Sequence, residues 1–199
     1  MVYNRKDGWY RKAKQEGFRS RAAYKLEELD RRAQLFTRGD KVLDLGCAPG
    51  GWLQFAAKKV GPRGRVVGID RLEMKPLPEL QQVQILLGDI TEAESLERLR
   101  EALGGPADVV LSDMAPDTSG VGFTDHMRSL ELVRLAFETS LVLLKPGGTF
   151  AAKIFDGPDL EDLVKDIKAR FGKTRRIRPE ATRKGSRELY LVATRFKPA

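Results

Sequence analysis

Hydrophobic residues along this chain gather in short runs, which alternate with longer stretches where apolar positions recur at helical spacing. Short runs of about five residues are typical of buried β-strands, and the periodic stretches are typical of amphipathic helices. The runs predict strands at residues 41–45, 65–69, 83–87, 107–112 and 148–154. The periodic stretches predict helices at residues 20–35, 51–60, 91–103, 124–144 and 158–171. We expect Ser20 to cap the first helix and Thr91 the third.

Two further strands are predicted at residues 174–178 and 188–195. The segment between them is too short for a helical crossover, so we expect them to be antiparallel. The earlier strands alternate with helices, which predicts right-handed βαβ units and a mainly parallel sheet. The expected fold class is therefore α/β, a Rossmann-like seven-stranded sheet that ends in a C-terminal antiparallel hairpin, as in class I methyltransferases. Ligands of such sheets bind beyond the carboxyl ends of the strands.

Length and composition predict a single soluble domain over residues 1–199. Hydrophobic residues make up 41% of the chain, and no apolar run approaches the roughly 18 residues of a membrane helix. The N-terminal segment lacks the apolar core of a signal peptide. With one cysteine and one histidine, an internal disulfide is excluded and a zinc site is disfavoured. We expect a cytoplasmic monomer without a metal.

Charge is distributed unevenly along the chain, whose net charge is +8. Residues 1–25 carry 8 Lys and Arg against 2 Asp and Glu, and residues 168–199 carry 11 against 2. The two flanks together sum to +15, which leaves the segment between them at −7. Such flanks can merely solvate helices and a terminus, or they can form a cationic surface for a polyanion such as nucleic acid.

A glycine-rich segment, DLGCAPGGW at residues 44–52, follows the first predicted strand. Its glycines allow a sharp turn and a close approach of the backbone to a ligand. It lacks the dinucleotide pattern G-x-G-x-x-G, because Ala48 stands where the second glycine should be. Since that pattern serves a pyrophosphate, this loop suits a nucleoside without phosphates, such as S-adenosylmethionine. From the loop alone, an ordinary tight turn stays an alternative.

Acidic residues stand at or just after the ends of three other strands: Asp70, Asp89 and Asp113. The carboxylate of Asp70 can accept hydrogen bonds from both hydroxyls of a ribose, and Asp89 is placed to meet an adenine edge. All three are expected on one rim of the sheet, which favours a cofactor site over three unrelated turns. Asp70 would serve the ribose of a nicotinamide dinucleotide equally well.

Further charged residues are expected on the same rim. Lys25 lies in the first predicted helix, Lys153 ends the fifth strand and Glu188 opens the last. Together with Asp113 and the strings YRKAKQEGFRSRAAYKL, DLGCAPGGW, SDMAP, AAKIF and SRELYLV, this set resembles the FtsJ-type ribose 2′-O-methyltransferases, the RlmE family. The resemblance covers nearly the whole chain, and the motifs lie in the family's order and spacing.

The resemblance implies a function and its residues. It implies that Lys25, Asp113, Lys153 and Glu188 form a catalytic tetrad. The residues implied to contact S-adenosylmethionine are Gly50, Gly51, Trp52, Asp70, Asp89 and Asp113. It also implies that the methyl acceptor is the 2′-OH of a uridine in large-subunit (23S) rRNA, in an assembled or nearly assembled subunit.

Elementary chemistry assigns roles within the tetrad. A ribose hydroxyl attacks poorly until its proton is leaving, so the enzyme needs a base and in-line positioning. A lysine base must be neutral, and desolvation and the like charge of Lys25 favour that form of Lys153, whereas the two acids oppose it. We therefore expect Lys153 to be the base, Lys25 to position the hydroxyl, and the acids to orient both ammonium groups.

The basic flanks are expected to hold an RNA backbone at the tetrad. In the N-terminal flank these residues lie between positions 5 and 21, and in the C-terminal flank they are Arg175, Arg176, Arg178, Arg183, Lys184 and Arg187. Methylation of a tRNA anticodon loop stays an alternative, because YRKAKQEG also resembles the tRNA-directed branch, as does a non-catalytic RNA-binding relic. His126 is expected to be a helix cap or a surface residue, and Cys47 is disfavoured as a nucleophile.

Overall fold

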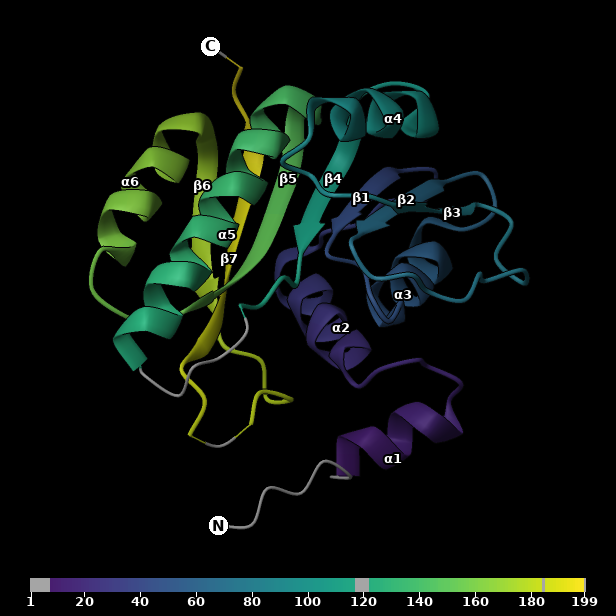
Figure 1. The fold of residues 1–199 in the computed structure, drawn as a ribbon, viewed down its shortest axis with the longest axis horizontal. Coiled ribbons are helices and arrows are strands. Elements are labelled where there is room, and N and C mark those ends of the chain that lie inside the picture. Colours follow the sequence, from purple (N-terminus) through teal and green to yellow (C-terminus); the bar gives the residue numbers. More distant parts are fainter. Residues whose placement is uncertain (1–7, 117–121, 184, 199) are drawn as a thin grey trace.

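Seven strands form the centre of the molecule in the computed structural model, which describes residues 8–116, 122–183 and 185–198. They are β1 (Lys41–Leu45), β2 (Arg65–Asp70), β3 (Val83–Leu87), β4 (Ala107–Ser112), β5 (Leu144–Phe155), β6 (Phe171–Ile177) and β7 (Glu188–Phe196). The strands lie in one sheet in the order β3-β2-β1-β4-β5-β7-β6 (Figure 1).

The strand directions confirm the predicted fold class. The strands β1 to β5 are mutually parallel where they pair. In contrast, β7 runs antiparallel to both β5 and β6. Because β7 is inserted beside β5, its residues face the end of that strand, with Lys153 opposite Tyr190 and Phe155 opposite Glu188. This insertion brings the start of the last strand to the carboxyl end of the parallel sheet.

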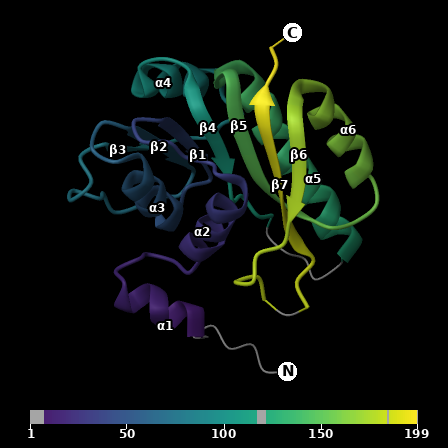
Figure 2. The ribbon, with the colours of Figure 1, turned by 180° about the vertical axis from the view of Figure 1, so that it is seen from behind.

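Six helices among the described residues surround this sheet: α1 (Gly8–Gln15), α2 (Ala22–Ala33), α3 (Gly51–Val60), α4 (Ala93–Leu103), α5 (Gly122–Leu143) and α6 (Leu160–Arg170). On one face lie α4, α5 and α6, and on the other lie α2 and α3, with α1 outside α2 (Figures 1 and 2). In the described ranges, no helix combines the length and the apolar character needed to cross a membrane.

Side chains of the central strands supply two hydrophobic cores. In β1, Val42 packs into the core under α2 and α3, whereas Leu43 and Leu45 pack into the core under α4, α5 and α6. All three are fully buried, and burying each such side chain contributes about 1.5–3 kcal/mol. Burial on both faces explains why these strands appear in the sequence as continuous apolar runs rather than as alternating patterns.

Of the two predicted helix caps, the one at Ser20 is supported and the one at Thr91 was wrong. Ser20 Oγ accepts the Ala22 N–H at 3.2 Å at the start of α2, where Arg21 already has helical φ and ψ angles. Thr91 does not start α4, since both its N–H and its hydroxyl bind Asp89 Oδ1 at 2.9 Å. Short polar side chains can form such local turns in competition with capping. Here both hydrogen-bond donors of Thr91 bind the carboxylate of Asp89.

The sequence patterns did not predict α1. This helix has only eight residues, and isolated helices of that length are marginal in water. It is held by ring contacts, because the ring centroids of Trp9 and Tyr24 lie 5.2 Å apart and Lys12 Nζ lies 4.6 Å from the centroid of the Tyr24 ring. Tertiary packing against α2 therefore stabilises a helix that periodicity alone cannot indicate.

Candidate active site

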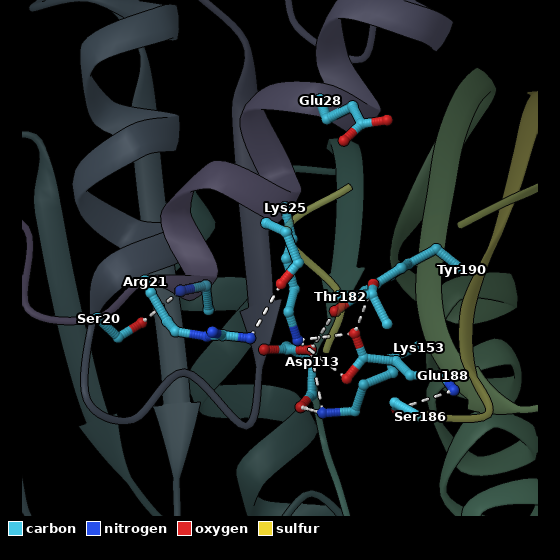
Figure 3. A network of polar contacts seen from close by, with 12 residues as sticks. Ser20, Arg21, Lys25, Glu28, Asp113, Lys153, Thr182, Ser186, Glu188 and Tyr190 are labelled. Carbon is cyan, nitrogen blue, oxygen red and sulfur yellow. Dashed lines mark hydrogen bonds and ion pairs between the residues drawn. The ribbon is translucent and has the colours of Figure 1, made fainter. Parts of the chain in front are cut away.

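Four charged side chains from separate elements meet at the carboxyl ends of β4 and β5 (Figure 3). Lys25 lies on α2, Asp113 directly follows β4, Lys153 lies near the end of β5, and Glu188 opens β7. Lys153 Nζ is 3.0 Å from Asp113 Oδ1, and Lys25 Nζ is 2.7 Å from Glu188 Oε1. The structure thus brings together the four residues that the sequence predicted for the tetrad.

Both lysines of this cluster are buried. Lys25 is 9% exposed and Lys153 is 7% exposed. A charge taken out of water is stable only when it is paired and hydrogen-bonded, and each ammonium has its own carboxylate. Lys153 Nζ also donates to the backbone oxygen of Asp113 at 2.5 Å. The site therefore consists of two neighbouring ion pairs, with Lys153 held by the chain immediately after β4.

Asp113 is the carboxylate most strongly influenced by its neighbours. Burial acts to raise its pKa, but the charges of Lys153 and Lys25 and a hydrogen bond from Tyr190 hold the pKa below the ordinary value. Opposite charges and hydrogen-bond donors stabilise the ionised form of an acid. Asp113 is therefore a fixed negative charge at neutral pH, able to hold an ammonium group but not to serve as an acid.

Tyr190 completes the cluster and was not predicted as a site residue. It is fully buried, and its hydroxyl donates to Asp113 Oδ1 at 2.8 Å. Burial raises the pKa of Tyr190 well above its ordinary value, and the nearby charges of Asp113 and Glu188 raise it further, so the phenol stays protonated. The signal was present in the sequence, because residues two apart in a strand share a face and Tyr190 follows Glu188 at that spacing.

The segment between β6 and β7 is fastened to α2. Glu28 Oε2 accepts the Glu180 N–H at 2.7 Å, and Arg21 Nη2 donates to the Ala181 carbonyl at 2.9 Å. At the end of this segment, the Thr182 hydroxyl donates to Glu188 Oε1 at 3.3 Å. Lys25 lies on α2 and Glu188 follows this segment. The contacts therefore hold both partners of the Lys25–Glu188 pair in place.

The glycine-rich loop after β1 turns sharply beside the cluster. Gly46 and Gly50 have φ values of 74° and 109°, which side chains with a Cβ rarely adopt. A Cβ at Gly46 would also collide with the Met114 side chain. Asp70 Oδ2 accepts the Ala48 N–H at 2.8 Å and so holds the loop against the end of β2. The loop therefore has the close-approach geometry expected of a ligand cradle.

The predicted cofactor residues take different positions around this loop. Gly50 is the N-cap of α3 and Gly51 is its first residue. Trp52 is buried in the core, and its indole N–H donates to the Ala22 carbonyl at 2.9 Å. Its ring also packs at 5.8 Å from that of Tyr190. Trp52 thus connects α3, α2 and β7, and a contact with the cofactor stays a prediction.

Asp70 and Asp89 lie at the same rim, Asp70 as the last residue of β2 and Asp89 two residues after the end of β3. Asp70 Oδ1 accepts the Leu72 N–H at 2.9 Å. Hydrogen bonds from the backbone and the hydroxyl of Thr91 lower the pKa of Asp89, and Arg71 lowers it further. Both carboxylates are therefore anchored by backbone N–H groups at the edge where the sequence predicted a nucleoside.

Asp44 is a buried acid that sequence reasoning did not single out. Neither of its carboxylate oxygens has a hydrogen-bond partner in the described part of the chain, and the residue is fully buried. Burial raises its pKa well above the ordinary value, and the charges of Asp113 and Asp70 raise it further. An unpartnered buried carboxyl group beneath the glycine-rich loop fits a site that receives a polar ligand.

Two other predicted features have different outcomes. His126 was expected to be a helix cap or a surface residue, but it is fully buried. Its ring nitrogens contact the carbonyl oxygens of Phe155, at 2.9 Å, and Pro158, so it supports the loop after β5. Cys47 is a buried thiol whose pKa is raised by burial and by the charges of Asp44 and Asp70, which opposes a thiolate nucleophile.

The C-terminal basic flank does not lie on one side. Arg175 Nη1 donates to the carbonyl of Arg32 at the end of α2, whereas Arg176 pairs with Glu161 of α6 at 2.7 Å. Successive strand residues point to opposite faces, so the expectation that Arg176 helps to hold an RNA backbone at the tetrad was wrong. Two basic residues of the predicted RNA-binding flanks, Arg5 in the N-terminal flank and Lys184 in the C-terminal flank, lie outside the described residues.

The sheet order, the reversed β7 and the glycine-rich loop after β1 define a Rossmann-like methyltransferase. A family model described as FtsJ-like methyltransferase matches residues 18–196. The chain belongs to the FtsJ-like methyltransferase family. Members of methyltransferase families of this kind generally use S-adenosylmethionine as the methyl donor.

Known proteins of similar sequence and structure bear related names. A Haloarcula marismortui protein named Ribosomal RNA large subunit methyltransferase E is 50% identical over 195 residues, covering 94% of this chain and 74% of its own. One of the same name from Methanothrix thermoacetophila is 44% identical over 199 residues, covering 100% and 76%. The crystal structure of a Plasmodium falciparum ribosomal RNA methyltransferase has a TM-score of 0.80 at 29% identity, covering 92% of this chain and 100% of that one.

Proposed function

We propose that this enzyme transfers a methyl group from S-adenosylmethionine to a ribose 2′-OH of RNA, and that its target is a uridine of 23S rRNA. The observation that carries this proposal is the pair of buried lysines, each bound to one carboxylate, beside the glycine-rich loop. The names of the relatives, which refer to large-subunit rRNA, support the choice of substrate. We further infer that the enzyme acts as a monomer in the cytoplasm.

The cofactor is proposed to lie along the rim formed by the loop and the strand ends. The residues that would hold it are Gly50, Gly51, Trp52, Asp70, Asp89 and Asp113. The tight glycine turn and the unpartnered carboxyl group of Asp44 support the fit of a polar nucleoside there. When bound, S-adenosylmethionine supplies an activated methyl group.

The protein's own work is to position the hydroxyl and remove its proton. Lys153 Nζ, in its neutral form, accepts the proton as the ribose O–H bond breaks. Tyr190 donates to the same Asp113 oxygen that pairs with Lys153, which weakens the hold of that carboxylate on the ammonium charge. Lys25, fixed by Glu188, holds the hydroxyl oxygen and its developing negative charge.

Two alternatives receive less support from the molecule. A non-catalytic RNA-binding relic would not need two buried ion pairs assembled from four separate elements. Methylation of tRNA would use the same chemistry, but the relatives described above are named for ribosomal RNA. The alternatives differ in which RNA accepts the methyl group, and this can be measured directly.

The test is to incubate the protein with methyl-labelled S-adenosylmethionine and separate pools of unmodified large ribosomal subunits, naked rRNA and tRNA. We expect label in large-subunit rRNA. Label in tRNA alone would replace the substrate assignment, and no label in any pool would favour the relic. The Lys153→Met variant serves as the control for label that does not depend on the tetrad.

A further inference from the structure

A cavity of about 350 Å³ lies between the C-terminal end of α2 and the β6–β7 hairpin. It is lined by Arg31, Arg32, Ala33, Gln34, Lys173, Arg175, Val192, Thr194 and Arg195. Five of these nine residues are Lys or Arg, and none is Asp or Glu. A concave surface with one sign of charge concentrates counter-ions, so the cavity is suited to an anion.

The strand geometry explains why positive side chains gather there. Ile177 of β6 packs into the core under α2 and α3, so Lys173 and Arg175, at even spacing from it, lie on the same face. They pair with Thr194 and Val192 of β7. Beyond the last residue of α2, no helix of the described part of the chain covers this face of the hairpin (Figure 2). The cavity floor is thus an open sheet surface, and the end of α2 forms its wall.

The cations of the cavity fall into two groups. Arg175 Nη1 donates to the Arg32 carbonyl at 2.6 Å, and Arg32 Nη1 lies 3.2 Å from Glu28 Oε1. The Arg175 bond joins the floor to the wall, and Arg32 Nη1 also donates to the Arg178 carbonyl at 3.4 Å. In contrast, the side chains of Arg31, Lys173 and Arg195 make no hydrogen bond or ion pair with any residue that the structure describes. Three exposed charges without a counter-ion surround a cavity that two other cations keep in shape.

We propose that this cavity binds phosphate groups of the RNA backbone, as a second contact away from the tetrad. Lys25 and Arg31 are six residues apart on α2, which corresponds to about 9 Å of helix rise. On β7, the path from Glu188 to Val192 spans about 13 Å. An RNA strand lying along α2 therefore reaches both sites, and the guanidinium groups bind its phosphates through paired N–H donors. The choice of RNA as the polyanion rests on the proposed function.

The test compares two double variants with equal loss of charge. Arg31→Gln/Lys173→Gln removes two of the unpaired cations of the cavity. Lys165→Gln/Lys168→Gln removes two exposed cations from α6, on the opposite face of the same hairpin. Binding of a large-subunit rRNA fragment to the full chain is measured without methyl donor, between about 0.05 and 0.3 M KCl. Thermal unfolding and S-adenosylmethionine binding report whether each variant keeps its fold.

For the cavity variant, we expect RNA affinity to fall about tenfold and the slope of log K against log salt to decrease by about 1.5, as for two lost phosphate contacts. The α6 variant should change affinity by less than about twofold. Equal losses in both variants, or unchanged affinity in the cavity variant, would overturn the proposal.

A titration with inorganic phosphate separates the two sources of the anion. If inorganic phosphate binds in the cavity but the cavity variant keeps its RNA affinity, the cavity is a small-anion site and the RNA contact is refuted. Because binding is measured without methyl transfer, failure of the proposed function remains distinguishable. A wild-type protein that methylates no RNA would refute that function and leave the binding result standing.

Discussion

The phenol of Tyr190 donates a hydrogen bond to Asp113 Oδ1 at 2.8 Å, the same oxygen that lies 3.0 Å from Lys153 Nζ. The carboxylate is thus shared between a neutral donor and an ammonium group. Because the oxygen has a limited capacity to accept, the tyrosine sets both the orientation of the carboxylate and the strength of its hold on Lys153.

Removing the tyrosine hydroxyl with Tyr190→Phe should lower kcat about tenfold while leaving S-adenosylmethionine affinity nearly unchanged. The lost hydrogen bond corresponds to about 1 kcal/mol, and the freed Asp113 oxygen then holds Lys153 Nζ more strongly and in a less fixed orientation. Steady-state kinetics with a cofactor-binding titration check this. An unchanged kcat would show that the tyrosine serves only packing.

The same variant has a pH signature. The pKa of Asp113 is lowered in the folded protein, so this group contributes stability above its ordinary value of 3.8, and the contribution is lost as pH falls through the lowered value. Tyr190→Phe raises that pKa towards the ordinary value. The deficit in unfolding free energy relative to wild type should therefore be present near pH 7 and disappear in strong acid, as measured by denaturant unfolding across pH.

Lys153→Met should reduce methyl transfer by at least about 100-fold, which is the size of a general-base contribution. The methionine keeps the length and the apolar stem of the lysine but cannot accept a proton. Binding of S-adenosylmethionine should stay within about twofold of wild type, since no residue proposed to hold the cofactor is changed. Loss of cofactor binding in place of turnover would contradict the assignment of Lys153 as the base.

Lys25→Met leaves Glu188 as a buried carboxylate without its ammonium partner. Breaking a buried pair in this way costs about 3 kcal/mol. The double variant Lys25→Met/Glu188→Gln should recover most of that loss but not the activity. Denaturant unfolding of wild type, both single variants and the double variant measures the coupling. Independent effects of the two substitutions would mean that the pair adds nothing to the fold.

Asp44→Asn should stabilise the protein near neutral pH. The pKa of Asp44 is raised by burial, so stability is complete below its ordinary value of 3.8 and is lost as pH rises towards the raised value. Asparagine resembles the protonated acid and removes this dependence. Tm should rise by about 2–4 °C at pH 7 for each kcal/mol recovered, with little difference near pH 3.5. A lower Tm at pH 7 would show that Asp44 has a stabilising partner.

The sequence was sufficient to predict the strands because they depend on local signals: apolar runs indicate β1 to β5. Lys153 and Asp113 could be placed at one edge of the sheet by the rule that strand ends share one edge, whereas the tetrad as a set was implied by the family resemblance. Tyr190 could have been found from the alternation of side chains along a strand, because it lies two residues after Glu188. Neither α1 nor the burial of His126 could be predicted, because both depend on tertiary contacts. Tyr24 of α2 packs against α1, and the loop after β5 covers His126. Asp44 looked like part of an apolar strand, and only the structure shows that neither carboxylate oxygen has a hydrogen-bond partner among the residues it describes.

The most direct test of the account is the identity of the methylated nucleoside. Unmodified large-subunit rRNA is treated with the wild-type protein and S-adenosylmethionine, digested to nucleosides and analysed by mass spectrometry. We expect 2′-O-methyluridine, absent from the Lys153→Met reaction. A product methylated on the base, or ribose methylation that persists in Lys153→Met, would contradict the proposed role of the buried lysine.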